Sequence, residues 1–437
     1  MAKENSGDRI RIHIKDKILD GILMPNKETD SVVIKLDNGY NVGIDNDKIT
    51  KIEVIKKQDK PVIEKKMAIG DDRNKKYITI LHTGGTIASR VDYKTGGVTA
   101  HFSAEDLVEM VPELKKISNI ETELVANMMS EDMLFSDYQK IAGSIKKHTE
   151  KGAHGIIIGH GTDTLAYTAA ALSFMFEKIN IPILIVGAQR SSDRGSSDAA
   201  SNLICAANFI TKTDFVGVGI CMHHTSSDSK CAILPAAKTR KMHTSRRDAF
   251  KPINDTPIAL VDYANKEVEF IKKDYRKKSK DNAVILKDKF ENRVGLLKTH
   301  TNMKTELFEF FAKSYKGIVI EGTGLGHVPT NLGDNIRNYE ILKKFIQEGG
   351  IVAITSQCIY GRVHKSIYTN LRRLSNIGCI FCEDMLPETT FLKLSWLLGN
   401  YSKKESTELL TKNLRGEINP RLEPEHFVKS KIDTPNQ

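Results

Sequence analysis

The sequence contains no apolar run near the ~20 residues that a membrane-spanning helix needs. Its first residues, MAKENSGDRIRIHIKD, lack the apolar core of a signal peptide. Six cysteines in 437 residues are too few for a disulfide framework. Cys379 and Cys382 have no second Cys or His pair to complete a metal site, so we interpret them as strand residues. We therefore expect a soluble, cytoplasmic protein with no membrane contact and no metal.

The sequence also lacks a GxxxxGK[ST] phosphate-binding loop and any other obvious nucleotide cradle, so we expect no ATP site in this chain. Acidic residues are in the minority, with a formal net charge of +10. Residues 266–280, KEVEFIKKDYRKKSK, carry seven Lys or Arg against three acids. This run is either a solvated hairpin or loop, or a contact for RNA or an acidic partner, and both interpretations stay open at this point.

Regular patterning is present and divides the chain into three parts. Residues 9–56 alternate apolar and polar in short bursts around Asp37-Asn38-Gly39, which predicts a small closed or nearly closed all-β barrel. Charged residues without steady periodicity follow as a linker that ends near residue 76. We place the domain boundaries at 1–76, 77–275 and 276–437.

From residue 77 onward, apolar strand runs alternate with segments of helical length. The first cycle contains YITILH, SDYQKIAGSIKKHTEKG, GIIIGH, TLAYTAAALSFMFEK and PILIVGA, and a second cycle begins at RVGLLKTH. Such alternation is typical of parallel sheets covered by helices. We therefore predict an α/β body of two domains with parallel sheets, joined through residues 266–290.

Polar residues follow three of these predicted strands, where ligands of parallel sheets bind. TGGT (83–86) follows YITILH, GTDT (161–164) follows GIIIGH, and QRSSD (189–193) follows PILIVGA. The glycines let backbone N–H groups approach a ligand and form an oxyanion hole; alternatively, these are tight turns whose threonines cap helices. Two hydroxyl-bearing turns and a carboxylate at one sheet edge favour a site. We interpret Thr164 as a helix cap and His160 as a packed residue.

A threonine hydroxyl is a poor nucleophile until a base takes its proton, and a neutral lysine in a cation-crowded pocket can do so. Residues 236–254, AAKTRKMHTSRRDAFKPIN, supply the candidates Lys238, Arg240, Lys241, Arg246, Arg247 and Lys251. The pattern alone leaves the choice among these lysines open.

The motifs ILHTGGTIAS, GIIIGHGTDTLAYTA, IPILIVGAQRSS and GIVIEGTGLGHVP occur in this order between about residues 77 and 402. Together they resemble the bacterial-type L-asparaginase and glutaminase family of amidohydrolases. The resemblance implies two α/β domains with an amide-hydrolysing site at the carboxyl ends of the first sheet. GTGLGHVP then corresponds to a second-domain loop that closes the amide pocket, not to a dinucleotide-binding turn.

The resemblance also implies roles for individual residues. Thr86 or Thr162 attacks the side-chain amide, and Lys241, found by counting back from Phe250-Lys251, receives the proton. Asp163 holds the substrate amino group or orients Lys241. The substrate-binding positions are Ser130 of MMSEDM, the N–H groups of the glycine turns at Gly85 and Gly161, and Tyr93. Tyr93 is the one tyrosine in SRVDYKTGGVTAHF, which has a glycine where the family places its loop tyrosine.

Plain asparaginases lack the leading β module. With that module and HTSRRDAFKPIN after the lysine, the whole chain resembles the glutamine-hydrolysing subunits of archaeal Glu-tRNA(Gln) amidotransferases. This implies that glutamine is hydrolysed to supply ammonia to a partner, the amidotransferase E subunit, which holds Glu-tRNA(Gln) and uses ATP and Mg. It also implies a homodimer within a 2:2 complex, with no cofactor in this chain. The alternatives are a free-standing L-asparaginase and a non-catalytic scaffold that binds RNA or protein.

Overall fold

The computed structural model describes most of the chain. Its described residues are 8–15, 17–24, 31–36, 41–57, 72–84, 90–91, 98–99, 111–190 and 197–427.

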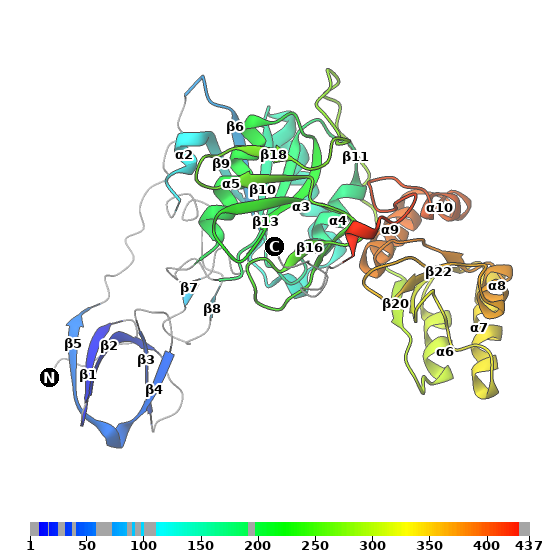
Figure 1. Cartoon of the computed structure of the whole chain (residues 1–437), viewed down its shortest axis with the longest axis horizontal. Helices are drawn as coiled ribbons and strands as arrows, with labels where there is room; N and C mark the ends of the chain where they lie inside the picture. The colour runs from blue at the N-terminus through cyan, green and yellow to red at the C-terminus, as the bar shows by residue number, and fades with distance from the viewer. Residues whose placement is uncertain are drawn as a thin grey trace, which may run out of the picture.

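The N-terminal part forms a five-stranded antiparallel sheet in the order β4-β3-β2-β1-β5. The strands are β1 Arg9–Ile14, β2 Lys17–Met24, β3 Ser31–Lys35, β4 Asn41–Asp45 and β5 Ile49–Lys56, with the short turn η1 Asn46–Lys48 before β5. The strands curve round on one another (Figure 1), and Ile10, Ile12, Ile34 and Ile44 form their small buried core. The predicted small β domain is thus confirmed. The predicted turn at residues 37–39 lies outside the described residues, but β3 and β4 pair on either side of it.

The body is built on an eight-stranded sheet in the order β18-β17-β14-β13-β12-β10-β6-β9 (Figure 1). Five strands are parallel: β9 Asn119–Leu124, β6 Tyr77–His82, β10 Gly155–Gly159, β12 Pro182–Val186 and β13 Gly217–His223. Three antiparallel strands extend one edge: β14 Lys230–Pro235, β17 Ala259–Asp262 and β18 Val268–Phe270. The parallel strands β6, β10 and β12 match the prediction, whereas β9 and the antiparallel edge were not predicted. The basic run 266–280 therefore begins in the β17–β18 hairpin and not in the expected connection between domains.

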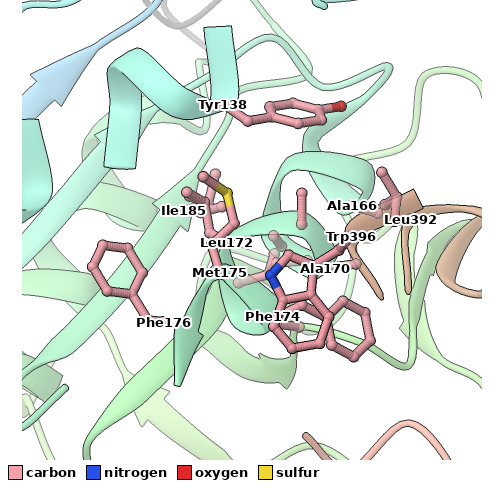
Figure 2. Packing of buried hydrophobic residues seen from close by; sticks show 14 of the residues in the cluster. Tyr138, Ala166, Ala170, Leu172, Phe174, Met175, Phe176, Ile185, Leu392 and Trp396 are labelled. Carbon is pink, nitrogen blue, oxygen red and sulfur yellow. The ribbon is translucent and has the colours of Figure 1, made fainter. Parts of the chain in front are cut away.

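Helices α2 Leu114–Ile117, α3 Phe135–Glu150, α4 Leu165–Met175 and α5 Ala199–Lys212 belong to this first domain. Every residue of α4 except Tyr167 is buried, as expected for a helix that is apolar on all sides. Phe174 of α4 packs on Trp396 of α9 Pro387–Asn400, with ring centroids 5.8 Å apart (Figure 2). The two domains therefore share one hydrophobic core.

The second domain contains a four-stranded parallel sheet in the order β20-β21-β22-β23. The strands are β20 Val294–Lys298, β21 Gly317–Gly322, β22 Ile351–Ser356 and β23 Ile380–Phe381, and the further helices are α6 Thr305–Ser314, α7 Ile336–Gln347, α8 Thr369–Asn376 and α10 Lys403–Leu410. Cys379 and Cys382 are buried, unpaired thiols that flank β23; the strand is present as predicted, but neither cysteine lies in it.

Short two-stranded ribbons complete the body. They are β15 Thr239–Lys241 with β16 Phe250–Pro252, β11 Phe176–Lys178 with β19 Ile285–Leu286, and β7 Arg90–Val91 with β8 Val98–Thr99. Among the described residues, no helix has the length and apolar character needed to cross a membrane. No group of His, Cys, Asp or Glu within the same residues has the arrangement of a metal site.

Candidate active site

The carboxyl edge of the large sheet brings three chain segments together. His82, Gly159 and Val186 are register partners in β6, β10 and β12, so the residues that follow them leave the sheet side by side. Thr83 continues this pairing, because both its N–H and its hydroxyl donate to the Gly159 carbonyl at 3.1 Å. The first two predicted motifs are therefore adjacent in space.

The backbone conformation and a close backbone neighbour both require glycine at position 84. Its φ is +100°, and a Cβ at this position would lie 2.4 Å from the Met128 carbonyl oxygen. The backbone neighbour of this glycine is thus Met128, in the segment after β9. Gly85, Thr86 and Tyr93 lie outside the described residues, so their predicted roles stay predictions.

The turn after β10 carries Thr162 and Asp163. Thr162 is buried, whereas the Asp163 side chain is 67% exposed. Gly187, directly after β12, leaves room for Thr162, because a Cβ there would approach the Thr162 methyl carbon to 2.8 Å. Gly187 was not among the predicted site residues, although a glycine directly after a buried strand is a signal for close packing.

Lys241 comes from the β15–β16 ribbon and reaches both residues of this turn. Its Nζ donates to Thr162 Oγ1 at 2.9 Å and to Asp163 Oδ1 at 2.7 Å. The lysine side chain is largely buried, at 14% exposed. A hydroxyl, an amine and a carboxylate from segments 78 and 79 residues apart are thereby joined in one chain of hydrogen bonds.

Ser130 packs against the same turn. A Cβ on Gly161 would lie 2.8 Å from both Cβ and Oγ of Ser130, so only a glycine lets the serine side chain pack on this turn. Thr164 is the N-cap residue of α4, as predicted, but its side chain makes no cap bond. Its hydroxyl donates instead to the Ser130 carbonyl at 2.6 Å. It therefore ties the serine segment to the turn that carries Thr162 and Asp163.

His160 is fully buried and hydrogen-bonded on both nitrogens. Nδ1 lies 2.6 Å from the Gly161 carbonyl and Nε2 lies 2.8 Å from Thr168 Oγ1. Burial lowers the pKa of His160 to about 4, although the Gly161 carbonyl opposes this shift. The ring is thus neutral near pH 7, in agreement with its interpretation as a packed residue.

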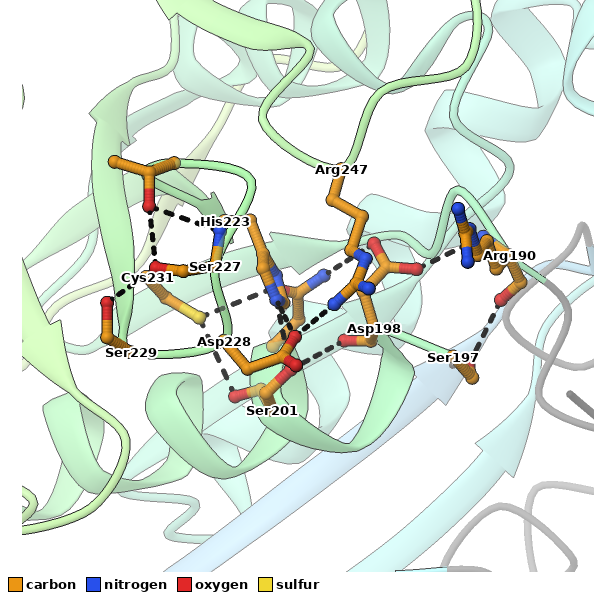
Figure 3. Close-up of polar contacts among 12 residues, drawn as sticks. Arg190, Ser197, Asp198, Ser201, His223, Ser227, Asp228, Ser229, Cys231 and Arg247 are labelled. Carbon is orange, nitrogen blue, oxygen red and sulfur yellow. Dashed lines mark hydrogen bonds and ion pairs between the residues drawn. The ribbon is translucent and has the colours of Figure 1, made fainter. Parts of the chain in front are cut away.

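A second polar network lies beside the loop that follows Lys241 (Figure 3). His223 Nδ1 contacts Asn202 Oδ1 at 2.7 Å, and its Nε2 contacts Asp228 Oδ1 at 3.0 Å; Arg247 also donates to Asp228. Ser201 lies 3.5 Å from the same Nε2, so serine and aspartate share one ring nitrogen. A Ser-His-Asp triad needs them on opposite nitrogens. We assign this network to holding the loop in place.

Gly187→Ala is expected to reduce turnover at least tenfold and to cost about 1–3 kcal/mol of stability, because the new methyl group displaces Thr162 from Lys241. Steady-state ammonia release and urea unfolding measure the two effects. The matched control is Gly143→Ala on the exposed side of α3, where the added methyl group meets no atom within 4 Å and activity should not change. Equal activity of the two variants would contradict this packing argument.

Comparison with known proteins agrees with the observed architecture. Residues 77–276 match the family model "Asparaginase, N-terminal", and residues 293–410 match "Glutaminase/Asparaginase C-terminal domain". The thermostable L-asparaginase from Thermococcus kodakarensis superposes with a TM-score of 0.71 at 29% identity, covering 79% of this chain and 100% of that one. L-asparaginase I from Vibrio cholerae gives a TM-score of 0.68 at 26% identity, with 79% and 99% covered.

The N-terminal sheet and the full-length relatives decide the family. Residues 5–55 match the model "GatD N-terminal domain". The D subunit of glutamyl-tRNA(Gln) amidotransferase from Pyrococcus furiosus is 47% identical over 432 residues, which cover 97% of each chain. That of Methanococcus maripaludis is 44% identical over 420 residues, covering 95% of this chain and 98% of the relative. This chain belongs to the amidotransferase D-subunit family.

Membership of the D-subunit family accounts for both parts of the chain. The asparaginase-like body is shared with free-standing enzymes, whereas the β module is what the amidotransferase D subunits add to it. The sequence-based recognition of an asparaginase-like body behind a small β domain is confirmed. The contacts among Lys241, Thr162 and Asp163 therefore lie in the asparaginase-like body of a D-subunit family member.

Proposed function

We propose that this chain is the glutaminase subunit of a tRNA-dependent amidotransferase. It hydrolyses glutamine to glutamate and ammonia, and the ammonia converts Glu-tRNA(Gln) to Gln-tRNA(Gln) on a partner subunit. The observation that carries the proposal is the pair of contacts from Lys241 Nζ to Thr162 and Asp163. A non-catalytic scaffold would have no need to keep a largely buried amine on a threonine hydroxyl.

In this reaction, Thr86 or Thr162 attacks the side-chain amide carbon of glutamine. Once Nζ of Lys241 has released a proton, its lone pair can accept the Thr162 proton across the 2.9 Å contact. The N–H groups of the glycine turns at Gly85 and Gly161 are proposed to stabilise the oxyanion. The C–N bond then breaks, the nitrogen takes up the proton and leaves as ammonia, and water hydrolyses the acyl-enzyme to glutamate.

Substrate positioning falls to the groups around this chain of hydrogen bonds. Oδ1 of Asp163 accepts from Lys241, which leaves Oδ2 of this exposed carboxylate to hold the substrate amino group. We assign the Ser130 hydroxyl, packed on Gly161, to the substrate carboxylate. Tyr93 stays a proposed substrate-binding residue.

We propose the amidotransferase E subunit as the partner, with Glu-tRNA(Gln), ATP and Mg bound there, and no cofactor in this chain. A homodimer within a 2:2 complex fits this division of labour, and a role in aminoacyl-tRNA synthesis fits a protein of the cytoplasm. This context predicts that the isolated chain releases ammonia from glutamine slowly. Addition of the partner and Glu-tRNA(Gln) is expected to raise the rate at least tenfold, since coupling prevents wasteful glutamine loss.

The decisive measurement is an ammonia assay with glutamine and with asparagine, with and without partner and Glu-tRNA(Gln). The similarity to solved L-asparaginases makes a free-standing asparaginase the second candidate. That function predicts rapid asparagine hydrolysis by the chain alone and no response to the tRNA. Glutamine turnover that is unaffected by partner and tRNA would refute the amidotransferase role.

A further inference from the structure

The strand that carries Lys241 belongs to neither large sheet. β15 pairs only with β16 in the described structure, through Thr239↔Pro252, Arg240↔Lys251 and Lys241↔Phe250. Three residue pairs form a small ribbon that is marginal by itself. Contacts outside the ribbon must therefore set the position of the lysine.

Strand geometry sorts these contacts by face. Successive side chains along an extended chain point to opposite sides, so within β15 Lys241 shares a side with Thr239, whereas Arg240 points to the other; Lys238 lies in the turn just before the strand. Lys241 reaches Thr162 and Asp163 of the first domain. Lys238 and Arg240 both contact the second domain.

The Lys238 contact is a fully buried ion pair with Asp384. Both side chains are 0% exposed, and Nζ donates to Oδ2 of Asp384 and, at 3.3 Å, to its carbonyl oxygen. Burial lowers the pKa of Lys238, and the carboxylate of Asp384 opposes that shift. Asn419 donates to the same carboxylate through its backbone N–H at 2.9 Å and its side-chain amide at 3.0 Å. A pair that is desolvated and saturated in this way fixes geometry more than it adds stability.

Two further contacts act on the same short stretch. Arg240 Nε lies 3.5 Å from Oε1 of the buried Glu388, and the Thr389 hydroxyl donates to the Ala237 carbonyl at 3.0 Å. Asp384, Glu388 and Thr389 all lie at or just before the first turn of α9, whose other end is packed into the shared core. The turn that leads into β15 is thus held at Ala237 and Lys238, and β15 itself at Arg240, by residues at the start of α9.

We propose that Asp384, Glu388 and Thr389 form an interdomain clamp that positions Lys241 for proton transfer. These are positioning residues that act through the ribbon. The second domain then contributes to the reaction by holding the base, which gives the two-domain architecture a catalytic purpose. The inference rests on the proposed function and deepens it.

The clamp predicts a specific kinetic signature. Asp163 and Ser130 lie outside the ribbon, so loosening the clamp should leave KM for glutamine within about twofold. A displacement of the base by about 1 Å costs on the order of 100-fold, so kcat should fall between about tenfold and 100-fold. A loss of stability alone would instead lower the amount of active protein.

The test compares two neutralised buried pairs of the same kind. The clamp variant is Lys238→Met with Asp384→Asn, in which the single amide oxygen can keep the bond from the Asn419 backbone N–H, while the side-chain amide of Asn419 loses its acceptor on Oδ2. The matched control is Lys393→Met with Glu417→Gln. Lys393 and Glu417 are also 0% exposed, 2.6 Å apart and attached to α9, but they contact residues 412–415 and not the ribbon. Arg240→Gln loosens the clamp at a partly exposed residue, and Arg240→Lys is its conservative rescue.

Each variant is measured for kcat, KM and urea midpoint, and the Lys241 Nζ to Thr162 Oγ1 distance is determined by crystallography. We expect the clamp variant and Arg240→Gln to lose kcat and the 2.9 Å contact, Arg240→Lys to recover most of kcat, and the control to lose only stability. The clamp is overturned if its folded variant keeps that contact, or if the control loses kcat equally. If the wild-type protein releases no ammonia, the proposed function is refuted. The clamp is then still tested by the distance from Lys241 Nζ to Thr162 Oγ1 in the variants.

Discussion

Lys241→Met is expected to reduce ammonia release from glutamine at least ~1,000-fold, because the threonine loses its proton acceptor while its hydroxyl stays in place. Methionine matches the length of the aliphatic stem, so the buried packing of the side chain is kept. The unfolding midpoint should therefore change little. Initial rates by a coupled ammonia assay, with the unfolding midpoint as the control for folding, measure the two effects.

Two companion variants separate possible roles of Lys241. Lys241→Arg keeps the positive charge but cannot lose a proton near neutral pH, so it should stay as inactive as the methionine variant. Lys251→Met is the control variant. Lys251 is the register partner of Arg240 in the ribbon, and its amine donates to the His224 carbonyl. This variant should keep most of the activity. Full turnover in Lys241→Met would show that the base lies elsewhere.

The second large effect is a loss of stability between about pH 6.5 and pH 4. Burial lowers the pKa of His82 and of His160 to about 4 in the folded protein, whereas unfolded histidine titrates near 6.5. In this window the unfolded state binds more protons, so the free energy of unfolding falls as the pH falls. A shift of about 2.5 units corresponds to about 3 kcal/mol for each residue.

Urea unfolding at several pH values between 7 and 4 measures this loss. His160→Gln should reduce the dependence of the unfolding free energy on pH by about half. Parallel curves for wild type and His160→Gln would contradict the assignment.

Carboxylates change the stability at lower pH than these histidines. Burial alone would raise the pKa of Glu123, but hydrogen bonds from Lys147, His148 and Ser144 lower it to about 2, so its contribution is lost below about pH 4.5.

Local patterning was sufficient for most of the fold. The parallel strands β10 and β12 are buried on both faces and are continuous apolar runs in the sequence, as parallel strands covered by helices should be. The antiparallel strands β14, β17 and β18 were missed; β17 and β18 are short, and β18 lies in a basic run. These strands form because they pair with neighbouring strands of the folded sheet, and the local pattern of apolar and polar residues does not reveal such pairing.

In the site, too, features set by local sequence could be predicted, whereas contacts between distant segments could not. Turn residues such as Thr162 and Asp163 could be predicted from their place after a strand, and the family resemblance selected Lys241 among several cations. The direction of the Thr164 hydroxyl could not be predicted, because its acceptor on Ser130 lies 34 residues away. The pairing of Lys238 with Asp384 spans 146 residues and two domains, so only the folded structure reveals it.

The two hydrogen bonds from Asn419 to the Asp384 carboxylate have a consequence for protein engineering. The family model of the C-terminal domain ends at residue 410, yet Asn419 beyond it supplies two of the donors to this buried carboxylate. A chimera or shortened gene cut at that boundary would remove both donors. Protein designers who graft this body onto another module should retain the polypeptide at least through Asn419.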